Sequence, residues 1–340
     1  MAAALALVAV GVVATHEDDG EVEVRATVPE SPRVTSVAAA LRPAPHEEGI
    51  LEPSVAGLPS EGITVKDGDA VLLLDVSGNV LHRLDGFDLW QGTNLRGPSG
   101  TYAIDSAAGT LRRTSDHVIP LAYDGRLVVG EQVPTAFVER DGHVVFNLGA
   151  RSYGISYDAD IVTLLSDEQP RAYDLRTDTT RTLPAQCEVA DRHGRAWFLT
   201  CYDSETSESS IRRLRADGRT TVVTGQLEHG GWEGVLVSPD GLRFLGLASH
   251  DCGAPPQVLI GSTTSGRVRE LRSWIGVDGE PDVEALGWTA AGEAVFTLGS
   301  ADGGSGVFAF DGTTLRTLHV TADPWPRAAM WLPPPRPTAT

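Results

Sequence analysis

The sequence predicts an all-β chain folded as a single β-propeller. The first observation behind this prediction is a hairpin that recurs seven times between Val71 and Gly312, each time as an apolar strand, a tight turn and a second strand. Most of these turns contain glycine, which favours a hairpin because it tolerates positive φ. Their centres lie on average about 39 residues apart, the period of a four-stranded propeller blade. The turns are 76–79, 107–110, 140–143, 176–179, 216–219, 264–267 and 310–313.

The second observation is an apolar run that precedes the hairpin in several periods. Examples are 161–165, 196–199, 242–247 and 294–298. These runs are nearly continuous instead of alternating with polar residues, which is typical of strands covered on both faces. Blades stacked around an axis would cover both faces, so the runs favour a propeller over a two-layer sandwich.

The third observation is one period in which four strands can be assigned. We expect strand A at 234–237, strand B at 242–248, strand C at 257–261 and strand D at 267–271. Strands A and B are joined by the turn Ser238-Pro239-Asp240-Gly241, whose proline and glycine suit a tight reversal.

At this turn the chain resembles the WD-repeat-like and periplasmic TolB-like propellers, in which a Ser-Pro-Asp-Gly turn between strands A and B recurs. The turns 289–292 and 191–194 occupy the same place with altered residues, and no Trp-Asp dipeptide ends a strand C. The resemblance implies the architecture of most of residues 60–332. It implies no functional residue.

Closure of the ring is expected to involve the two ends of the propeller. The first hairpin, 70–84, lacks a full set of preceding strands, and the apolar segment 328–332 follows the seventh period as an unassigned strand. A C-terminal strand that completes the first blade would remove two exposed sheet edges. We therefore predict a closed ring of seven four-stranded blades, with six as the alternative if the weak stretch 88–114 belongs to its neighbours.

The chain outside the propeller divides into three segments. We predict a membrane-anchor remnant or signal segment at 1–15, a Pro-rich acidic tether at 16–60, the propeller at 61–332 and a disordered Pro-rich tail at 333–340. The apolar run of about 14 residues at the start is shorter than the ~20 that span a bilayer. It also lacks the basic flank of a signal peptide. The interpretation that reconciles these points is the end of a longer transmembrane segment, with a cleaved signal and a buried core element as alternatives.

Charge and composition exclude one class of partner and indicate a location. The net charge is −19, and the longest basic cluster is 211–215, whose arginines alternate as on a solvated strand. Nucleic-acid binding needs clustered Lys and Arg, so we exclude it. Acidic residues directly after the apolar run favour the extracytoplasmic face of a membrane. Lys66 is the only lysine, which indicates a high-GC bacterial genome.

The three cysteines are expected at one rim of the propeller. Cys187 begins a strand A, and Cys201 and Cys252 each follow a strand B. A Cys187–Cys201 bridge within a blade, which we favour slightly, and a Cys201–Cys252 bridge between blades are both geometrically open, and an extracytoplasmic location permits either. A zinc site formed by the three cysteines and His250 is a weaker alternative, because the spacing matches no compact zinc signature.

No catalytic, cofactor or metal site is predicted, because the usual catalytic and phosphate-binding motifs are absent. The segment His229-Gly230-Gly231-Trp232-Glu233 could supply an acid–base pair, although a tryptophan at a blade entry usually packs. The segments 158–160 and 302–304 carry aspartates that could bind calcium, but turns favour aspartate in any case.

Two classes of function follow. The leading hypothesis is a non-enzymatic, extracytoplasmic and membrane-anchored propeller, monomeric, that binds a protein or a small ligand through its loops. The alternative is a propeller hydrolase or lyase with its site at the axial mouth. A pair of carboxylates, or a histidine and a carboxylate, within hydrogen-bonding reach at that mouth would favour the enzyme.

Overall fold

The computed structural model describes most of the chain from Val55 to Trp331, and these described residues belong to one compact unit. In the described part, no helix is long and apolar enough to cross a membrane. The expected N-terminal segment, most of the tether and the tail lie outside the described residues. The described residues are 55–91, 94–105, 108–114, 119–123, 127–132, 135–140, 143–147, 154–158, 161–165, 170–174, 177, 179–206, 208–225, 230–250, 257–271, 282–299, 305–323 and 326–331.

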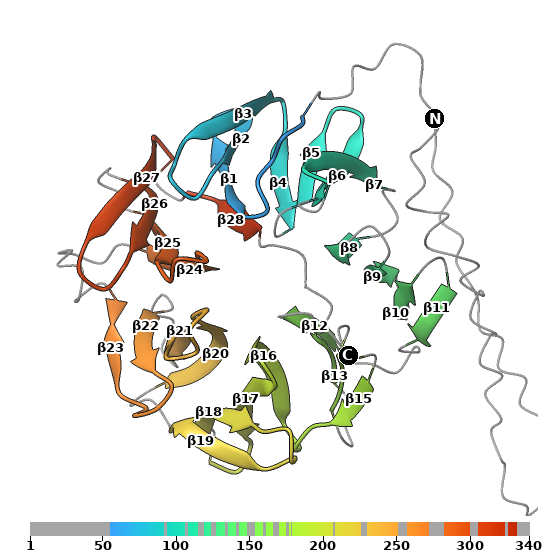
Figure 1. Cartoon of the computed structure of the whole chain (residues 1–340), viewed down its shortest axis with the longest axis vertical. Coiled ribbons are helices and arrows are strands. Elements are labelled where there is room, and N and C mark those ends of the chain that lie inside the picture. Colours follow the sequence, from blue (N-terminus) through green and yellow to red (C-terminus); the bar gives the residue numbers. More distant parts are fainter. Residues whose placement is uncertain are drawn as a thin grey trace, which may run out of the picture. The chain divides into compact units, whose positions relative to one another are not determined.

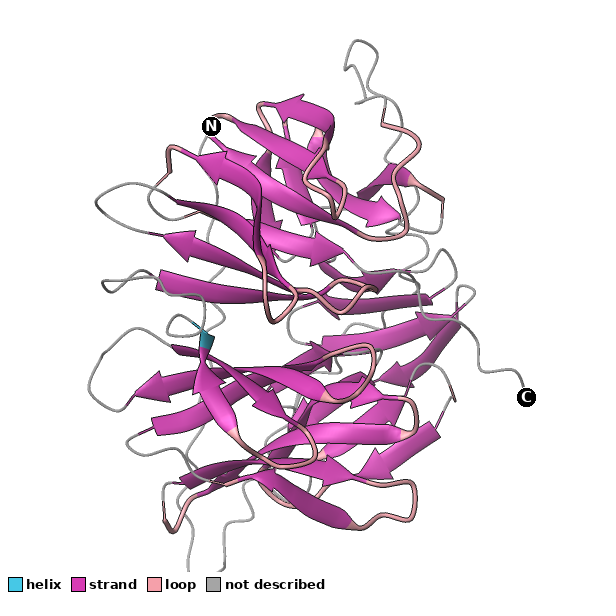
Figure 2. Cartoon of the chain, turned by 60° about the vertical axis from the view of Figure 1, so that its left-hand side comes forward, coloured by secondary structure: helices cyan, strands magenta, loops and turns pink. Residues whose placement is uncertain are grey.

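Strands make up nearly all the regular structure (Figure 2). The described residues form seven four-stranded antiparallel sheets, and six of them use four strands that are consecutive in the chain. The first sheet instead combines the last strand with the first three. Its strands, in order across the sheet, are β28 (Ala328–Trp331), β1 (Gly62–Asp67), β2 (Ala70–Leu74) and β3 (Val80–Asp85).

The next three sheets follow in chain order, and the elements are labelled in Figure 1. The second contains β4 (Asp88–Gln91), β5 (Asn94–Gly97), β6 (Gly100–Asp105) and β7 (Thr110–Thr114). The third contains β8 (Ile119–Tyr123), β9 (Leu127–Gln132), β10 (Thr135–Arg140) and β11 (His143–Asn147). The fourth contains β12 (Gly154–Asp158), β13 (Ile161–Leu165), β14 (Arg171–Asp174) and β15 (Thr179–Thr182).

The last three sheets carry the sites discussed below. The fifth contains β16 (Cys187–His193), β17 (Ala196–Asp203), β18 (Glu208–Leu214) and β19 (Thr220–Thr224). The sixth contains β20 (Gly230–Val237), β21 (Arg243–His250), β22 (Gln257–Ser262) and β23 (Val268–Glu270). The seventh contains β24 (Asp282–Trp288), β25 (Ala294–Gly299), β26 (Ser305–Phe310) and β27 (Leu315–Thr321). In Figure 1, β16, β20 and β24 lie toward the centre of the view, and β19, β23 and β27 toward its outside.

All seven predicted turns join the third strand of a sheet to its fourth. The first of them shows why the chain reverses there. The Asp75 carboxylate accepts hydrogen bonds from the backbone N–H of Ser77 and of Asn79, each at 2.9 Å. Gly78 has a φ of 90°, a conformation that side chains disfavour. The Asp75 carboxylate and Gly78 together fix this reversal. The recurring turn in the sequence corresponds to the same connection in each sheet.

The core lies between neighbouring sheets. Phe198 of the fifth sheet and Phe244 of the sixth belong to one buried cluster, and Ile63 of the first sheet shares another with Val295 and Val307 of the seventh. Strands with neighbours on both faces bury both sets of side chains, as β25 does along its whole length. This burial explains why the apolar runs in the sequence are continuous.

The last strand pairs with the first. β28 lies antiparallel to β1, with Trp331 opposite Gly62 and Ala328 opposite Val65. The Trp331 indole donates a hydrogen bond of 3.1 Å to the Pro59 carbonyl. Residues 328–331 are thus the missing strand of the first sheet, and the weak stretch 88–114 forms a four-stranded sheet of its own.

Three local predictions differ from the structure. The tether was expected to reach residue 60. Val55 and Leu58, two apolar residues between Pro53 and Pro59, are instead buried in the core shared by the first two sheets. The turn expected at 191–194 begins later, since β16 continues to His193, which pairs with Ala196. Cys201 lies inside β17 and does not follow it.

Candidate functional site

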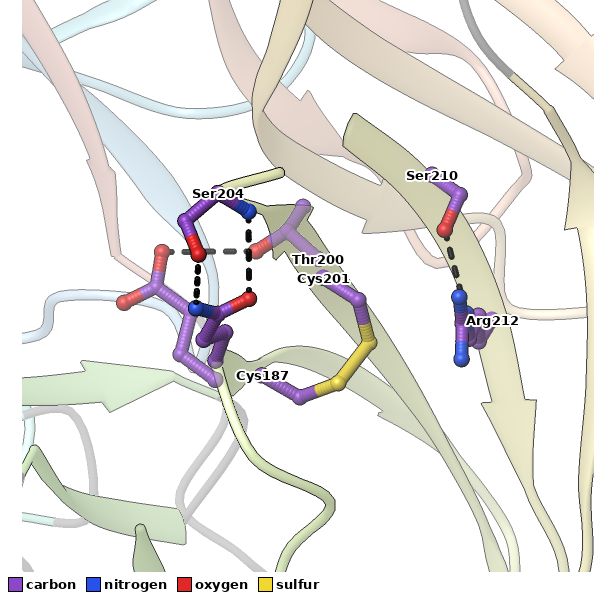
Figure 3. Close-up of a disulfide and its surroundings, with 8 residues drawn as sticks. Cys187, Thr200, Cys201, Ser204, Ser210 and Arg212 are labelled. Carbon is purple, nitrogen blue, oxygen red and sulfur yellow. Dashed lines mark hydrogen bonds between the residues drawn. A yellow bond between two sulfur atoms is a disulfide. The ribbon is translucent and has the colours of Figure 1, made fainter. Parts of the chain in front are cut away.

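One end of the β16–β19 sheet carries a disulfide. Cys187 and Cys201 face each other in the register of β16 and β17, and their sulfurs are bonded at 2.07 Å (Figure 3). This is the within-blade pair that the sequence favoured. Cys252, the other proposed partner of Cys201, lies outside the described residues.

The polar groups next to the disulfide are engaged with one another. The Gln186 amide donates to Ser204 Oγ at 2.7 Å and accepts from the Ser204 N–H at 3.3 Å. The Gln186 carbonyl accepts from the Tyr202 N–H at 2.9 Å. Gln186 has a φ of 59°, which is uncommon without glycine, and these three bonds hold it there.

A half-buried carboxyl, that of Glu188, follows Cys187 in the chain. Burial raises the pKa of Glu188, and the hydrogen bond from Thr200 Oγ1 at 3.3 Å acts in the opposite direction (Figure 3). Loss of water also raises the pKa of Glu284 on β24. Within the described residues, no hydrogen bond links Glu188 to Glu284 or to a histidine, so this geometry offers no acid–base pair.

The segment around Trp232 is structural where it is described. The Trp232 ring is buried, packs edge-on against Phe244 with 6.0 Å between ring centroids, and donates from its indole N–H to the Gly225 carbonyl at 3.1 Å. The Trp232 backbone N–H donates to Ser209 Oγ. These bonds join the sixth sheet to the fifth, so the tryptophan packs as its position at the start of a blade suggested.

The remaining candidates are incompletely described. His229 and the aspartates at 160 and 302 lie outside the described residues, and the side chains of Asp158, Glu233 and His250 are not described either. Among the described residues, no group of three or more His, Cys, Asp or Glu side chains could hold a metal ion.

A pocket lies at the opposite end of the same sheet. His193 pairs with Ala196 and Trp197 with Leu214, so the β16–β17 turn lies next to the end of β18. The cavity between them has a volume of about 420 Å³, and its walls are mostly carbon. It is lined by His193, Gly194, Arg195, Ala196, Arg213, Arg215 and Ala216.

Three arginines give this pocket its character. Arg195, Arg213 and Arg215 make no ion pair with any carboxylate that the structure describes, whereas Arg219 nearby lies 4.0 Å from Asp217. The Arg213 guanidinium lies over the Phe198 ring at 5.9 Å, and its Nε is buried without a hydrogen-bond partner. The alternating arginines of 211–215 predicted a solvated strand and gave no sign of this pocket. Alternation along β18 does not reveal that the β16–β17 turn lies next to its end.

Asp240 and Asp217, two acids beside residues that line the pocket, accept hydrogen bonds within their own turns. The Asp240 carboxylate accepts from Ser238 Oγ at 2.6 Å and from the Leu242 N–H at 2.9 Å, and these bonds, with smaller contributions from Arg243 and His193, lower its pKa. Asp217 accepts from the Arg219 N–H at 3.1 Å. The pocket therefore presents positive charge that is only partly offset by its surroundings.

Residues at this end of β16 also bind the neighbouring sheets. Arg192 Nη1 lies 2.9 Å from the Asp174 carboxylate of the fourth sheet, and the two side chains are 5% and 4% exposed. The Asp191 carboxylate accepts from the Val237 N–H of the sixth sheet. These contacts fix the strand that ends in the pocket.

The chain matches no known protein family, and no curated protein resembles it in sequence. It is similar in structure to a prolyl endopeptidase from a study of two such enzymes, with a TM-score of 0.54 and 13% identity over 84% of this chain and 50% of that one. It is also similar to TolB from Acinetobacter baumannii, with a TM-score of 0.41 and 12% identity over 80% of this chain and 66% of TolB.

A third similar structure is the β-propeller domain of the Trilobed protease from Pyrococcus furiosus, with a TM-score of 0.46 and 10% identity over 75% of this chain and 84% of that one. The chain spans half the length of the prolyl endopeptidase and 66% of TolB. Identities this low concern the fold alone. The seven four-stranded sheets that follow one another along the chain have the arrangement of a β-propeller, and the likeness to the prolyl endopeptidase concerns this fold alone.

Proposed function

We propose that this chain is a non-enzymatic binding module and that it binds its ligand in the pocket at the turn end of the β16–β19 sheet. The observation that carries the proposal is the set of three arginines without a described carboxylate partner, in a chain whose net charge is −19. Folding a cationic pocket into an acidic protein has no evident role in stability, because unpaired like charges repel one another. An anionic ligand bound between the three arginines would remove this repulsion.

Catalysis is the second candidate. An enzyme needs a positioned nucleophile, an acid–base pair or a metal. Glu188 favours this alternative most, since a carboxyl with a raised pKa suits a general acid. Its one hydrogen-bond partner among the described side chains is Thr200, a hydroxyl that does not form an acid–base pair with it. We therefore rank binding above a hydrolase or lyase.

We further propose an extracytoplasmic location at the membrane. The Cys187–Cys201 disulfide supports it, because structural disulfides persist in oxidising compartments. The apolar N-terminal run followed by acidic residues supports attachment through that segment. Fractionation of cells that express the full chain tests this: we expect it in the membrane fraction, accessible to protease from outside, and fully soluble protein would contradict it.

The seven sheets are proposed to form one closed ring of seven blades, joined where β28 meets β1. The antiparallel pairing of these strands supports closure. Deleting residues 328–340 would expose the β1 edge and leave the first blade with three strands. We expect a large loss of stability in urea unfolding, and a stability equal to that of the full chain would contradict closure.

Ligand capture tests the proposed binding function. The full chain is immobilised and exposed to an envelope extract, and bound proteins and small molecules are identified by mass spectrometry. We expect a retained species that is lost with the triple variant Arg195→Gln/Arg213→Gln/Arg215→Gln and kept with Arg219→Gln, which removes one charge outside the pocket. If the triple variant still retains the species, the ligand does not bind in this pocket and the proposal is contradicted.

An activity screen decides between binding and catalysis. Ester, glycoside and phosphate substrates are offered to the full chain and to Glu188→Gln. Turnover by the parent that is lost in the folded variant would establish the enzyme and overturn the binding proposal.

A further inference from the structure

We propose that the ligand of the arginine-lined pocket is a small organic anion, with a carboxylate or phosphate group attached to a compact apolar body. This inference rests on the proposed binding function and names the chemical class that the pocket would accept. Three features of the pocket carry it: its charge, one unsatisfied nitrogen and the composition of its walls.

The charge selects an anion. Arg195, Arg213 and Arg215 approach the cavity from the β16–β17 turn and from the end of β18. Asp217, which follows Ala216 in the chain, and Asp240, which His193 affects electrostatically, already accept hydrogen bonds within their own turns. Guanidinium groups bind planar carboxylates and tetrahedral phosphates through paired N–H donors, so either group would satisfy them.

The unsatisfied nitrogen indicates a missing hydrogen-bond partner inside the pocket wall. Arg213 Nε is buried and has no acceptor among the described residues. A buried donor without an acceptor is costly, and native proteins usually provide a partner, a water or an ion. The Phe198 ring lies under the Arg213 guanidinium, 5.9 Å from it. Because the nitrogen is buried, an acceptor on a ligand reaches it only when the Arg213 side chain turns toward the pocket.

The walls select a ligand with an apolar part. They are mostly carbon, and the lining residues include Ala196 and Ala216 beside the three arginines. The volume of about 420 Å³ lies within the ~300–1,000 Å³ range of small-molecule sites. A bare inorganic ion would occupy a small fraction of it, whereas an aromatic or branched aliphatic body would cover the carbon walls and remove them from water.

Calorimetric titration of the full chain with four probes tests the inference. Benzoate carries a carboxylate, phenyl phosphate a phosphate, benzamide is the neutral match of benzoate, and inorganic phosphate lacks the apolar body. We expect benzoate, phenyl phosphate or both to bind at least tenfold more tightly than benzamide and inorganic phosphate. The better of the two anions identifies the acidic group.

Variants assign the binding to the pocket. Arg195→Gln and Arg213→Gln should each weaken the better probe at least tenfold, and Arg219→Gln, the matched loss of one charge on the same hairpin, should change it less than twofold. Circular dichroism checks that each variant is folded. If Arg213→Gln is unfolded, the exposed-turn variant Arg195→Gln decides.

Equal binding of benzamide, no binding of either organic anion at millimolar concentration, or an equal loss with Arg219→Gln would overturn the inference. The capture experiment separates this failure from that of the proposed function. A captured species that still depends on the three arginines, in the absence of probe binding, leaves the binding function in place and rejects the ligand class alone. Loss of both results rejects both.

Discussion

The two ends of the β16–β19 sheet are built in opposite ways. At one end, the Cys187–Cys201 bond and the hydrogen bonds of Gln186 hold the sheet to itself. At the other end, Asp191 and Arg192 hold it to the sheets on either side, and neighbouring arginines line a pocket without described carboxylate partners. The first end is held by contacts within the sheet, whereas the second is held by contacts with the neighbouring sheets.

The difference shows how a repeated fold can carry a site. The seven sheets share one strand order, so the differences between them lie in the side chains that their turns carry. In the β16–β19 sheet, the end with the disulfide has polar groups bonded to one another, and the end with the arginines has none of their carboxylate partners among the described residues.

Breaking the contact between sheets at the turn end should have the largest effect. Arg192→Met removes the cation and leaves the Asp174 carboxylate buried at 4% exposure. The Asp174 carboxylate would keep the hydrogen bond from the Thr177 N–H at 3.3 Å but lose its buried cation. Removing one partner of a buried ion pair costs about 3–5 kcal/mol, so urea unfolding should show a loss of that order.

Two further variants sharpen this test. Arg219→Met removes an arginine whose side chain is 85% exposed and should cost at most about 1 kcal/mol, as exposed ion pairs do. The double variant Arg192→Met/Asp174→Asn should recover part of the loss, because it removes both charges. Equal losses for Arg192→Met and Arg219→Met would show that the contact between the sheets contributes little.

Removing the covalent bond at the other end should have the next largest effect. Cys187→Ala/Cys201→Ala opens a loop with a sequence separation of 14, and a bridge of this kind contributes about 2–4 kcal/mol, mainly by restricting the unfolded chain. Urea unfolding under non-reducing conditions measures the loss. Cys252→Ala is the control and should leave the stability unchanged, and a loss equal to that of the double variant would assign Cys252 a structural role.

The smallest effect concerns pH at the disulfide end. Because burial raises the folded-state pKa of Glu188 above its ordinary value of 4.5, its protonated form stabilises the fold. That contribution is complete below pH 4.5 and is lost as the pH rises through the folded-state pKa. Glu188→Gln keeps an acceptor for Thr200 but cannot ionise, so its stability relative to the parent should increase from pH 4 to pH 7.

Urea unfolding at several pH values checks this. Glu205→Gln, an exposed carboxyl on the turn after β17, should show no comparable trend. A Glu188→Gln difference that is constant with pH would contradict the assignment of the burial effect to this carboxyl.

The sequence predicted the fold well and the pocket poorly, and the reason is the range of the interactions. Hairpin turns such as that at Gly78 depend on residues two to four positions apart, so their pattern is visible in the chain. The Cys187–Cys201 pair was favoured because facing ends of a hairpin are also local. Arg195 lies in the turn after β16 and Arg213 on β18, and only the strand register places them at one pocket.

By itself, the amino-acid sequence determined the all-β class, the place of the turns and the continuous apolar strands, because φ preferences and burial patterns act on neighbouring residues. The unassigned strand at the C-terminal end also predicted the pairing of β28 in the first sheet, although its register with β1 came from the structure. The tertiary structure decided that Val55 and Leu58 belong to the core and that Arg192 binds Asp174 of another sheet. It also decided that Arg213 Nε is buried without a partner. These features depend on which segments meet in space, and such long-range contacts leave no periodic pattern in the chain.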